Sequence, residues 1–132
     1  MFSGCSSLKN LDITNFNFSN IKSVIHMFEG CSLLTSLDLS ILNSDSIQNM
    51  DFMFYNDIKL EYINLSNFQD SKITSMSHIF SGTPKNMVFC LIESKTKKLI
   101  KQLNITESCY VIDCSKRWMN VRKRIIDKNN TC

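Results

Sequence analysis

Six cysteines and two histidines are the residues of this chain best suited to nucleophilic, redox or metal chemistry. Cys5 and Cys31 are 26 residues apart, and the same spacing separates His26 from Phe52 and Phe52 from His78. The two cysteines thus hold equivalent positions, which favours a small buried residue there, with a mutual disulfide as the alternative. The phenylalanine between the histidines indicates packing or a loop face rather than a metal ligand. No nucleophile–base combination, Gly-rich phosphate loop or H-E-x-x-H motif accompanies them, so we expect no catalysis, no cofactor and no metal site.

The other four cysteines lie near the C-terminus, at Cys90, Cys109, Cys114 and Cys132, in the pattern C-x18-C-x4-C-x17-C. A four-cysteine zinc site usually contains close C-x2-C pairs, which this pattern lacks. Disulfides in an oxidising compartment are the better interpretation. We prefer a Cys90–Cys109 pair, which would tie a strand to the segment after the next helix. The pairing of Cys114 and Cys132 is left open, because Cys132 could also pair beyond the end of the sequence.

An internal repeat organises the chain. Residues 1–26, 27–52 and 53–78 align without gaps, and a fourth copy opens at Ile79 and departs after about half a unit. A fixed 26-residue period predicts a solenoid, in which each unit contacts only its neighbours. We therefore divide the chain into a repeat region, 1–92, with a partial unit at 79–92, and a C-terminal region, 93–132.

Each unit contains the pattern L-x-x-L-x-L, whose final L-x-L has the period of a short strand with one buried face. Strands from successive units are expected to pair in parallel, and Asp12, Asp38 and Asn64, between the apolar residues, are expected to point outward. We predict helical character from the later Val/Met position through the next Met-Phe-x-Gly, with a second short strand as the alternative. Positive φ angles are expected at one position of each unit: Gly4, Gly30, Asn56 and Gly82.

The C-terminal region lacks the period and reverses the charge. Residues 1–92 carry 5 lysines and 8 acidic residues, whereas residues 93–132 carry 10 basic and 4 acidic residues. ESKTKKLIKQLN predicts an amphipathic helix of about three turns, CYVIDC a strand, and SKRWMNVRKRIIDK a second helix. The basic residues of that last segment favour a solvated helix face over a nucleic-acid or anionic-membrane site; they are Lys116, Arg117, Arg122, Lys123 and Arg124.

The segments MFSGCSSLKNLDITNF, MFEGCSLLTSLDLS and MFYNDIKLEYINLSNF resemble the repeats of BspA-like leucine-rich-repeat surface proteins. The shared pattern is M-F-x-G-C-x-x-L-x-x-L-D-L-S, and it covers residues 1 to about 92. Departures are Asn56-Asp57 in place of Gly-Cys, and Pro84 and Asn86 in the last unit. The resemblance implies an α/β fold: a short leucine-rich-repeat-like solenoid with a parallel sheet and a helical, cysteine-containing C-terminal cap.

The same resemblance implies a non-catalytic binding or adhesion module at a cell surface or in a secreted protein. Protein or glycan partners are expected, and nucleic acid is not. The candidate partner-binding residues are the outward strand positions, which form three parallel rows: Asn10, Asp12, Thr14; Ser36, Asp38, Ser40; Tyr62, Asn64, Ser66. Two alternatives remain: a structural spacer within a larger surface protein, and a basic module that binds an acidic partner through Arg122, Lys123 and Arg124.

Three further expectations come from the sequence. No apolar run approaches the length of a membrane span. The chain starts in register with its own repeat and shows no secretory signal, so we expect a monomer or a piece of a longer array. Asn-x-Ser/Thr sites occur at Asn17, Asn64, Asn104 and Asn129, and they would be glycosylated only in a secreted eukaryotic protein.

Overall fold

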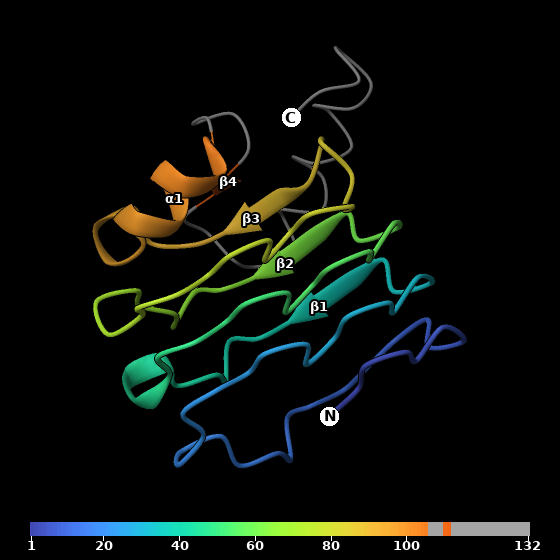
Figure 1. Cartoon of the computed structure of the whole chain (residues 1–132), viewed down its shortest axis with the longest axis horizontal. Helices are drawn as coiled ribbons and strands as arrows, with labels where there is room; N and C mark the ends of the chain where they lie inside the picture. Colours follow the sequence, from blue (N-terminus) through green and yellow to red (C-terminus); the bar gives the residue numbers. More distant parts are fainter. Residues whose placement is uncertain (106–109, 112–132) are drawn as a thin grey trace.

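The computed structural model describes residues 1–105 and 110–111, and it shows a mixed α/β fold with a small, open, parallel sheet (Figure 1). The sheet contains β1 (Ser36–Asp38), β2 (Tyr62–Asn64), β3 (Val88–Cys90) and β4 (Tyr110–Val111), in the order β1-β2-β3-β4. One α-helix, α1 (Lys97–Leu103), and two 3-10 turns, η1 (Ser44–Ser46) and η2 (Glu93–Lys95), complete the described elements. No helix in these residues is long and apolar enough to cross a membrane.

The register of the sheet follows the sequence repeat. Leu37 pairs with Ile63, and Ile63 pairs with Phe89, each partner lying one repeat period further along the chain. These apolar residues are buried, because the alternation of the L-x-L pattern turns every second side chain of a strand into the core. The predicted parallel sheet is therefore confirmed, although the first copy of the pattern, at Leu11 and Ile13, forms no strand.

The prediction of helical character from the Val/Met position through the next Met-Phe-x-Gly is wrong. The segment from Val24 to Gly30 instead donates every second amide to the next unit, as from Val24 N to Asn49 O at 3.0 Å and from Phe28 N to Met53 O at 2.9 Å. His26 has a φ angle of 55°, in the left-handed region, which a continuous α-helix does not allow. The alternative of a second strand-like segment is closer, since parallel bridges join Ser23, Asn49 and Ser75.

A ladder of phenylalanines runs through the core beside this segment. Phe2, Phe28, Phe54 and Phe80 stack in order, with ring centroids 5.4, 5.5 and 4.8 Å apart and ring planes within 6° of parallel. Phe28 and Phe54 are fully buried, and Phe2 at the end of the ladder is half-buried. The ladder exists because each unit contributes one ring at the same height, which offset stacking of aromatic rings stabilises.

The positions that we expected to need a positive φ angle have one. The φ angles are +74° at Gly4, +73° at Gly30, +83° at Gly82 and 62° at Asn56. These residues end a turn rather than a helix. Glycine suits the position because it has no Cβ, and asparagine is among the few other residues that tolerate it.

The repeat spacing of contacts continues beyond residue 92. Leu99 of α1 is buried one repeat period after Ile73, and Asn104 has a φ angle of 52°, close to the 54° of His78. Asp70 Oδ2 accepts a hydrogen bond from Leu99 N at 2.9 Å, which ties α1 to the preceding unit. The predicted amphipathic helix is present with seven residues, shorter than expected. The second predicted helix lies outside the described residues.

Candidate partner-binding surface

The outward-facing side chains of the sheet are exposed to solvent at β1 and become buried toward β3. Asp38, at the end of β1, is exposed, whereas Asn64, its partner in β2, is only 6% exposed, and Cys90, the next residue in register, is buried. We expected Asn64 to point outward into solvent, and this prediction is wrong. Asn64 lies between two paired strands, whereas Asp38 has a neighbouring strand on one side only.

The structure places the nine predicted partner-binding residues at three levels of exposure. Ser36 lies beside Tyr62 and Asp38 beside Asn64, so the rows of the second and third units are in register. The residues of the first unit precede the sheet and belong to no strand. The exposed members are Asn10, Asp12, Thr14 and Asp38; the partly buried ones are Ser36, Ser40, Tyr62 and Ser66; Asn64 is buried.

The acidic and amide side chains of these rows also shape the chain. Asp12, Asp38 and Asn64 each accept a hydrogen bond on Oδ1 from the amide two residues later, at 2.9, 2.8 and 3.0 Å. Such Asx turns bend the backbone out of a strand. The hydrogen bonds from Thr14, backbone first and hydroxyl second, lower the pKa of the Asp12 carboxyl. The D-x-T/S and N-x-S spacing signals these turns in the sequence, and our sequence analysis missed it.

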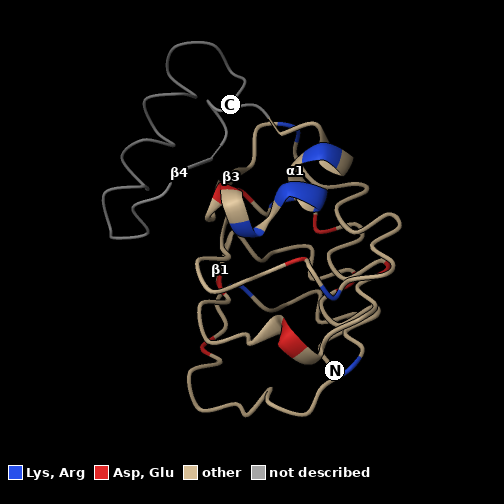
Figure 2. Ribbon diagram, turned by 90° about the vertical axis from the view of Figure 1, so that its left-hand side faces the viewer, with Lys and Arg blue, Asp and Glu red and all other residues tan. Residues whose placement is uncertain are grey.

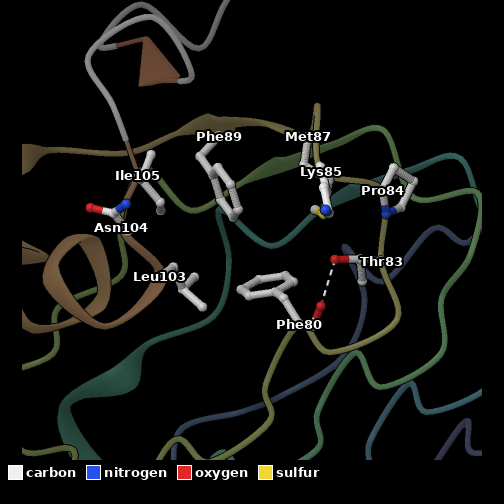
Figure 3. Close-up of a pocket in the computed structure, with 9 residues that line it drawn as sticks. All are labelled: Phe80, Thr83, Pro84, Lys85, Met87, Phe89, Leu103, Asn104 and Ile105. Atoms are coloured by element: carbon white, nitrogen blue, oxygen red, sulfur yellow. Dashed lines mark hydrogen bonds between the residues drawn. The ribbon is translucent and has the colours of Figure 1, made fainter. Parts of the chain in front are cut away.

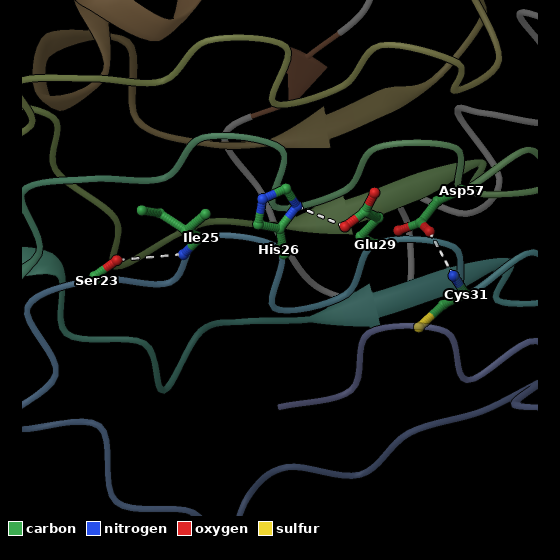
Figure 4. Close-up of polar contacts among 6 residues, drawn as sticks. All are labelled: Ser23, Ile25, His26, Glu29, Cys31 and Asp57. Atoms are coloured by element: carbon green, nitrogen blue, oxygen red, sulfur yellow. Dashed lines mark hydrogen bonds and ion pairs between the residues drawn. The ribbon is translucent and has the colours of Figure 1, made fainter.

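A second row of side chains lies on the left-handed residues of each unit. The rings of His26 and Phe52 stack at 5.0 Å, and those of Phe52 and His78 at 5.1 Å. Both histidines are exposed, and Nδ1 of His26 lies 2.5 Å from Glu29 Oε2 (Figure 4). The stacking agrees with our interpretation of this position as a packing or loop site. Within the described residues, no group of three or more His, Cys, Asp or Glu side chains could hold a metal ion.

The shared cysteine position is buried in the second and third units, at Cys31 and Asp57, and the third unit places a carboxylate there. Asp57 Oδ1 accepts a hydrogen bond from Cys31 N at 2.8 Å, whereas its Oδ2 has no hydrogen-bond partner among the described residues (Figure 4). Burial, with a smaller effect of Glu29, raises the pKa of Asp57 to about 7. Burial likewise raises the pKa of the Cys31 thiol to about 11, so this thiol stays protonated and unreactive at neutral pH.

The cysteines divide into free and bonded classes. Cys5 and Cys31 are free; Cys31 is buried, as we expected, whereas Cys5 is only partly buried. Cys90 is disulfide-bonded, and its partner lies outside the described residues. Cys109, Cys114 and Cys132 also lie there, so the preferred Cys90–Cys109 pair stays a prediction.

Charge is distributed unevenly between the units. Lysines gather on and before α1, at the C-terminal end of the described stack (Figure 2). The exposed members of this group are Lys95, Lys97, Lys98 and Lys101. Lys98 Nζ donates hydrogen bonds to the carbonyls of Ser71 and Ile73, at 3.3 and 3.2 Å, and so helps to hold α1 on the third unit.

Comparison with known proteins places these units in a family. A family model described as "Mycoplasma protein of unknown function, DUF285" matches residues 1–104, which is the span over which the repeat spacing of contacts holds. Searches of curated proteins and of solved structures found no match. The chain therefore belongs to the DUF285 family of Mycoplasma proteins.

Proposed function

We propose that this chain is a segment of a leucine-rich-repeat-like solenoid that acts as a non-catalytic binding module at a cell surface, as the resemblance to BspA-like proteins implies. The C-terminal region from α1 onward would cap the last unit. Two observations support this proposal: a hydrogen bond with the repeat spacing still joins Gln102 to Met76, and the disulfide at Cys90 suits an oxidising compartment. The partner would be a protein or a glycan.

The open polar face of the first two units carries the proposal. There the exposed or half-exposed residues stand in two neighbouring rows, while the equivalent face of β3 is buried. A partner would therefore contact Asn10, Asp12, Thr14, Ser36, Asp38 and Ser40 rather than all nine predicted residues. Regular polar rows suit an extended partner, because each row repeats the same donors and acceptors at the next level.

The test must change this face without breaking the Asx turns, so Asp12 and Asp38 are left intact. Asn10 and Ser36 have no side-chain hydrogen bond within the described residues, and the double variant Asn10→Arg/Ser36→Arg puts two large cations on the face. Binding of the full chain is measured on a glycan array and on immobilised extracellular-matrix proteins. We expect the binding seen for the parent chain to fall at least tenfold.

A matched control adds the same charge elsewhere. Asn20→Arg/Gln48→Arg changes two exposed side chains away from the sheet face and should bind like the parent. Equal loss in both double variants would show that charge alone weakens binding. Parent-level binding by the Asn10→Arg/Ser36→Arg variant would rule out this face as the partner site.

A structural spacer is the second candidate, and the uniformity of the stack favours it. Each junction repeats the same hydrogen bonds, as from Phe2 N to Met27 O and from Phe54 N to Ile79 O. Such an array holds its ends at a fixed separation whatever lies on its surface. If no glycan or protein is bound by the parent chain, while insertion of an additional unit lengthens the molecule in small-angle scattering, the spacer role is the better account.

A further inference from the structure

Two hollows in the described part of the chain differ in their chemistry. The first, of about 270 Å3, lies between β3 and the end of α1, and Phe80, Phe89 and Leu103 give it mostly apolar walls (Figure 3). Residues 103–105 form one wall and lie directly before residues outside the described part, so no ligand is assigned to this hollow. The second, of about 490 Å3, is lined mainly by polar side chains, all of them within residues 40–95. We call it the polar hollow.

The polar hollow is built from the loops that follow three neighbouring strands. These loops lie on the same side of the stack, because β1, β2 and β3 are parallel and in register (Figure 1). Its polar lining residues are Ser40, Asn43, Asp45, Asn67, Gln69 and Lys95. Asn43, Gln69 and Lys95 are each 26 residues apart, so three successive units contribute one polar side chain from the same position of the repeat.

Hydrogen bonds hold these side chains in place before any ligand arrives. Asn43 Oδ1 accepts a hydrogen bond from Asp45 N at 2.9 Å, and Gln69 Nε2 donates one to Asp45 Oδ1 at 2.9 Å. Asn67 Nδ2 donates to the carbonyl of Ser40 in the preceding unit. A ligand would therefore meet groups that are already ordered, and little of its affinity would be lost in fixing them.

The same side chains keep hydrogen-bonding groups that have no partner within residues 1–105 and 110–111. The donors are Asn43 Nδ2 and Lys95 Nζ, and the acceptors are Asn67 Oδ1, Gln69 Oε1 and Asp45 Oδ2. A ligand that satisfies both kinds must donate and accept hydrogen bonds over a short distance, as neighbouring hydroxyl groups do. The opposite charges of Asp45 and Lys95 also favour a neutral ligand over an anion or a cation.

We infer that the polar hollow binds a neutral sugar, as one pyranose ring of a glycan. Hydroxyl groups of the ring would accept hydrogen bonds from the two donors and donate to the three acceptors. The half-buried side chain of Ile41, which also lines the hollow, would contact the C–H groups of the ring. The hollow shares only Ser40 with the polar rows of the sheet, so this inference does not rest on the proposed function of those rows.

The test titrates the full chain, labelled with 15N, with the methyl α-glycosides of glucose, mannose, galactose and N-acetylglucosamine. We expect saturable shifts at the backbone amides of Asn43, Asn67, Gln69 and Lys95 with at least one of them. The dissociation constant should be on the order of 1 mM, as for a small ligand held by a few hydrogen bonds. Tetrahydropyran, a ring without hydroxyl groups, and sulfate, which only accepts hydrogen bonds, should give no saturable shifts at these amides.

Conservative variants locate the site. Asn43→Asp keeps the oxygen that holds Asp45 N and removes the donor, so it should weaken the sugar about fivefold, as expected for the loss of one hydrogen bond. Lys95→Met removes the other donor and should weaken it by a similar factor. Asn17→Asp is the matched control: Asn17 holds the same position one unit earlier, its Oδ1 accepts from Ser19 N at 3.0 Å, and it does not line the hollow. It should bind like the parent.

The outcomes that would overturn the proposal are specific. They are the absence of saturable shifts with all four glycosides, equal binding of tetrahydropyran, parent-level affinity in both Asn43→Asp and Lys95→Met, and equal weakening by Asn17→Asp. Tighter binding of sulfate than of every glycoside would show an anion site instead. Asn10→Arg/Ser36→Arg should keep the sugar affinity of the parent. A loss there as large as in Asn43→Asp would place the sugar on the polar rows of the sheet rather than in the hollow.

Discussion

Asp57 takes the position that Cys5, Cys31 and Thr83 hold in the other units, and it brings a carboxylate into the core. Its Oδ1 is partnered by the amide of Cys31, but its Oδ2 is not partnered by any described residue. An ionised carboxylate in such a place lacks the hydration that it has in the unfolded chain. Asp57 is therefore a built-in source of instability at neutral and higher pH.

The variant Asp57→Asn should remove a pH-dependent loss of stability. The folded pKa, about 7, lies above the ordinary value of 3.8, so the folded chain binds the extra proton between these values. The contribution of Asp57 is fully present below pH 3.8 and is lost as the pH rises to about 7. When the pH is raised from 4 to 8, the free energy of unfolding of the variant should increase relative to that of the parent by on the order of 4 kcal/mol. Urea unfolding at both pH values measures this gain.

Glu61→Gln supplies the control for that experiment, because Glu61 is exposed. It should follow the parent at both pH values. If the difference in free energy of unfolding between the parent and Asp57→Asn were the same at pH 4 and pH 8, a raised pKa at Asp57 would be contradicted.

Gly82→Ala should cost more stability than Gly4→Ala. Both residues have a positive φ angle, so an added methyl group strains each by about 1–2 kcal/mol. At Gly4 a Cβ would meet nothing within 4 Å, whereas at Gly82 it would lie 3.2 Å from the backbone of Asn56 and still closer to its side chain. Gly82→Ala should therefore lose about 1 kcal/mol more, measured by urea unfolding. Equal losses would mean that backbone conformation alone requires these glycines.

Residue types predicted some of these local features and concealed others. The three glycines, and Asn56 at the equivalent position of the third unit, predicted positive φ angles because few other residues tolerate such angles. His26, Phe52 and His78 share the same conformation, yet their types favour no such angle. The burial of Asn64 also gave no signal, because it depends on the strands at either side. The polar hollow was not predictable either, because it depends on how the loops after three strands meet.

At the scale of elements, the helix predicted in each unit and the segment observed there differ in where their hydrogen bonds go. An α-helix satisfies its amides within its own segment, so its sequence signal is local. The segment from Val24 to Gly30 instead satisfies every second amide in the following unit. Apolar spacing alone cannot distinguish the two, since both bury the same side chains. The parallel sheet was predictable because its alternation is visible in every copy.

Helix α1 begins without a cap of its own, and Asp70 replaces one. Its N-cap residue, Thr96, makes no side-chain capping bond, and Asp70 Oδ2 accepts the Leu99 amide of the first turn. Asp70→Ala should therefore leave that buried amide unpaired and destabilise the chain by about 1–2 kcal/mol. Hydrogen exchange should accelerate in residues 97–103, which mass spectrometry of peptic fragments can measure. Asp45→Ala, an exposed acidic residue in the preceding unit, is the control, and equal exchange in both variants would contradict this role.

In the part of the chain that the structure describes, each unit meets the next through the same ring stacks and amide bonds, and from β1 onward also through strand pairs. Stability in such an array is close to a sum of unit terms and junction terms. Removal of one complete unit should therefore delete one term of each kind and leave the other junctions in register. Removal of half a unit should place apolar positions against polar ones at the new junction.

Deletion of residues 27–52 should accordingly cost less stability than deletion of residues 27–39, although it removes twice as much of the chain. In the longer deletion His26 is followed by Met53, so Phe2 can stack on Phe54 and its amide can reach Met53 O as it now reaches Met27 O. Two complete units and the partial fourth copy remain, close to the three units that such arrays need. We expect cooperative urea unfolding with a lower m value for the longer deletion, because less surface is buried, and no cooperative transition for the shorter one. Cooperative unfolding of the shorter deletion with the stability of the longer one would show that the core tolerates any register, and the repeat period would then not be what holds the units together.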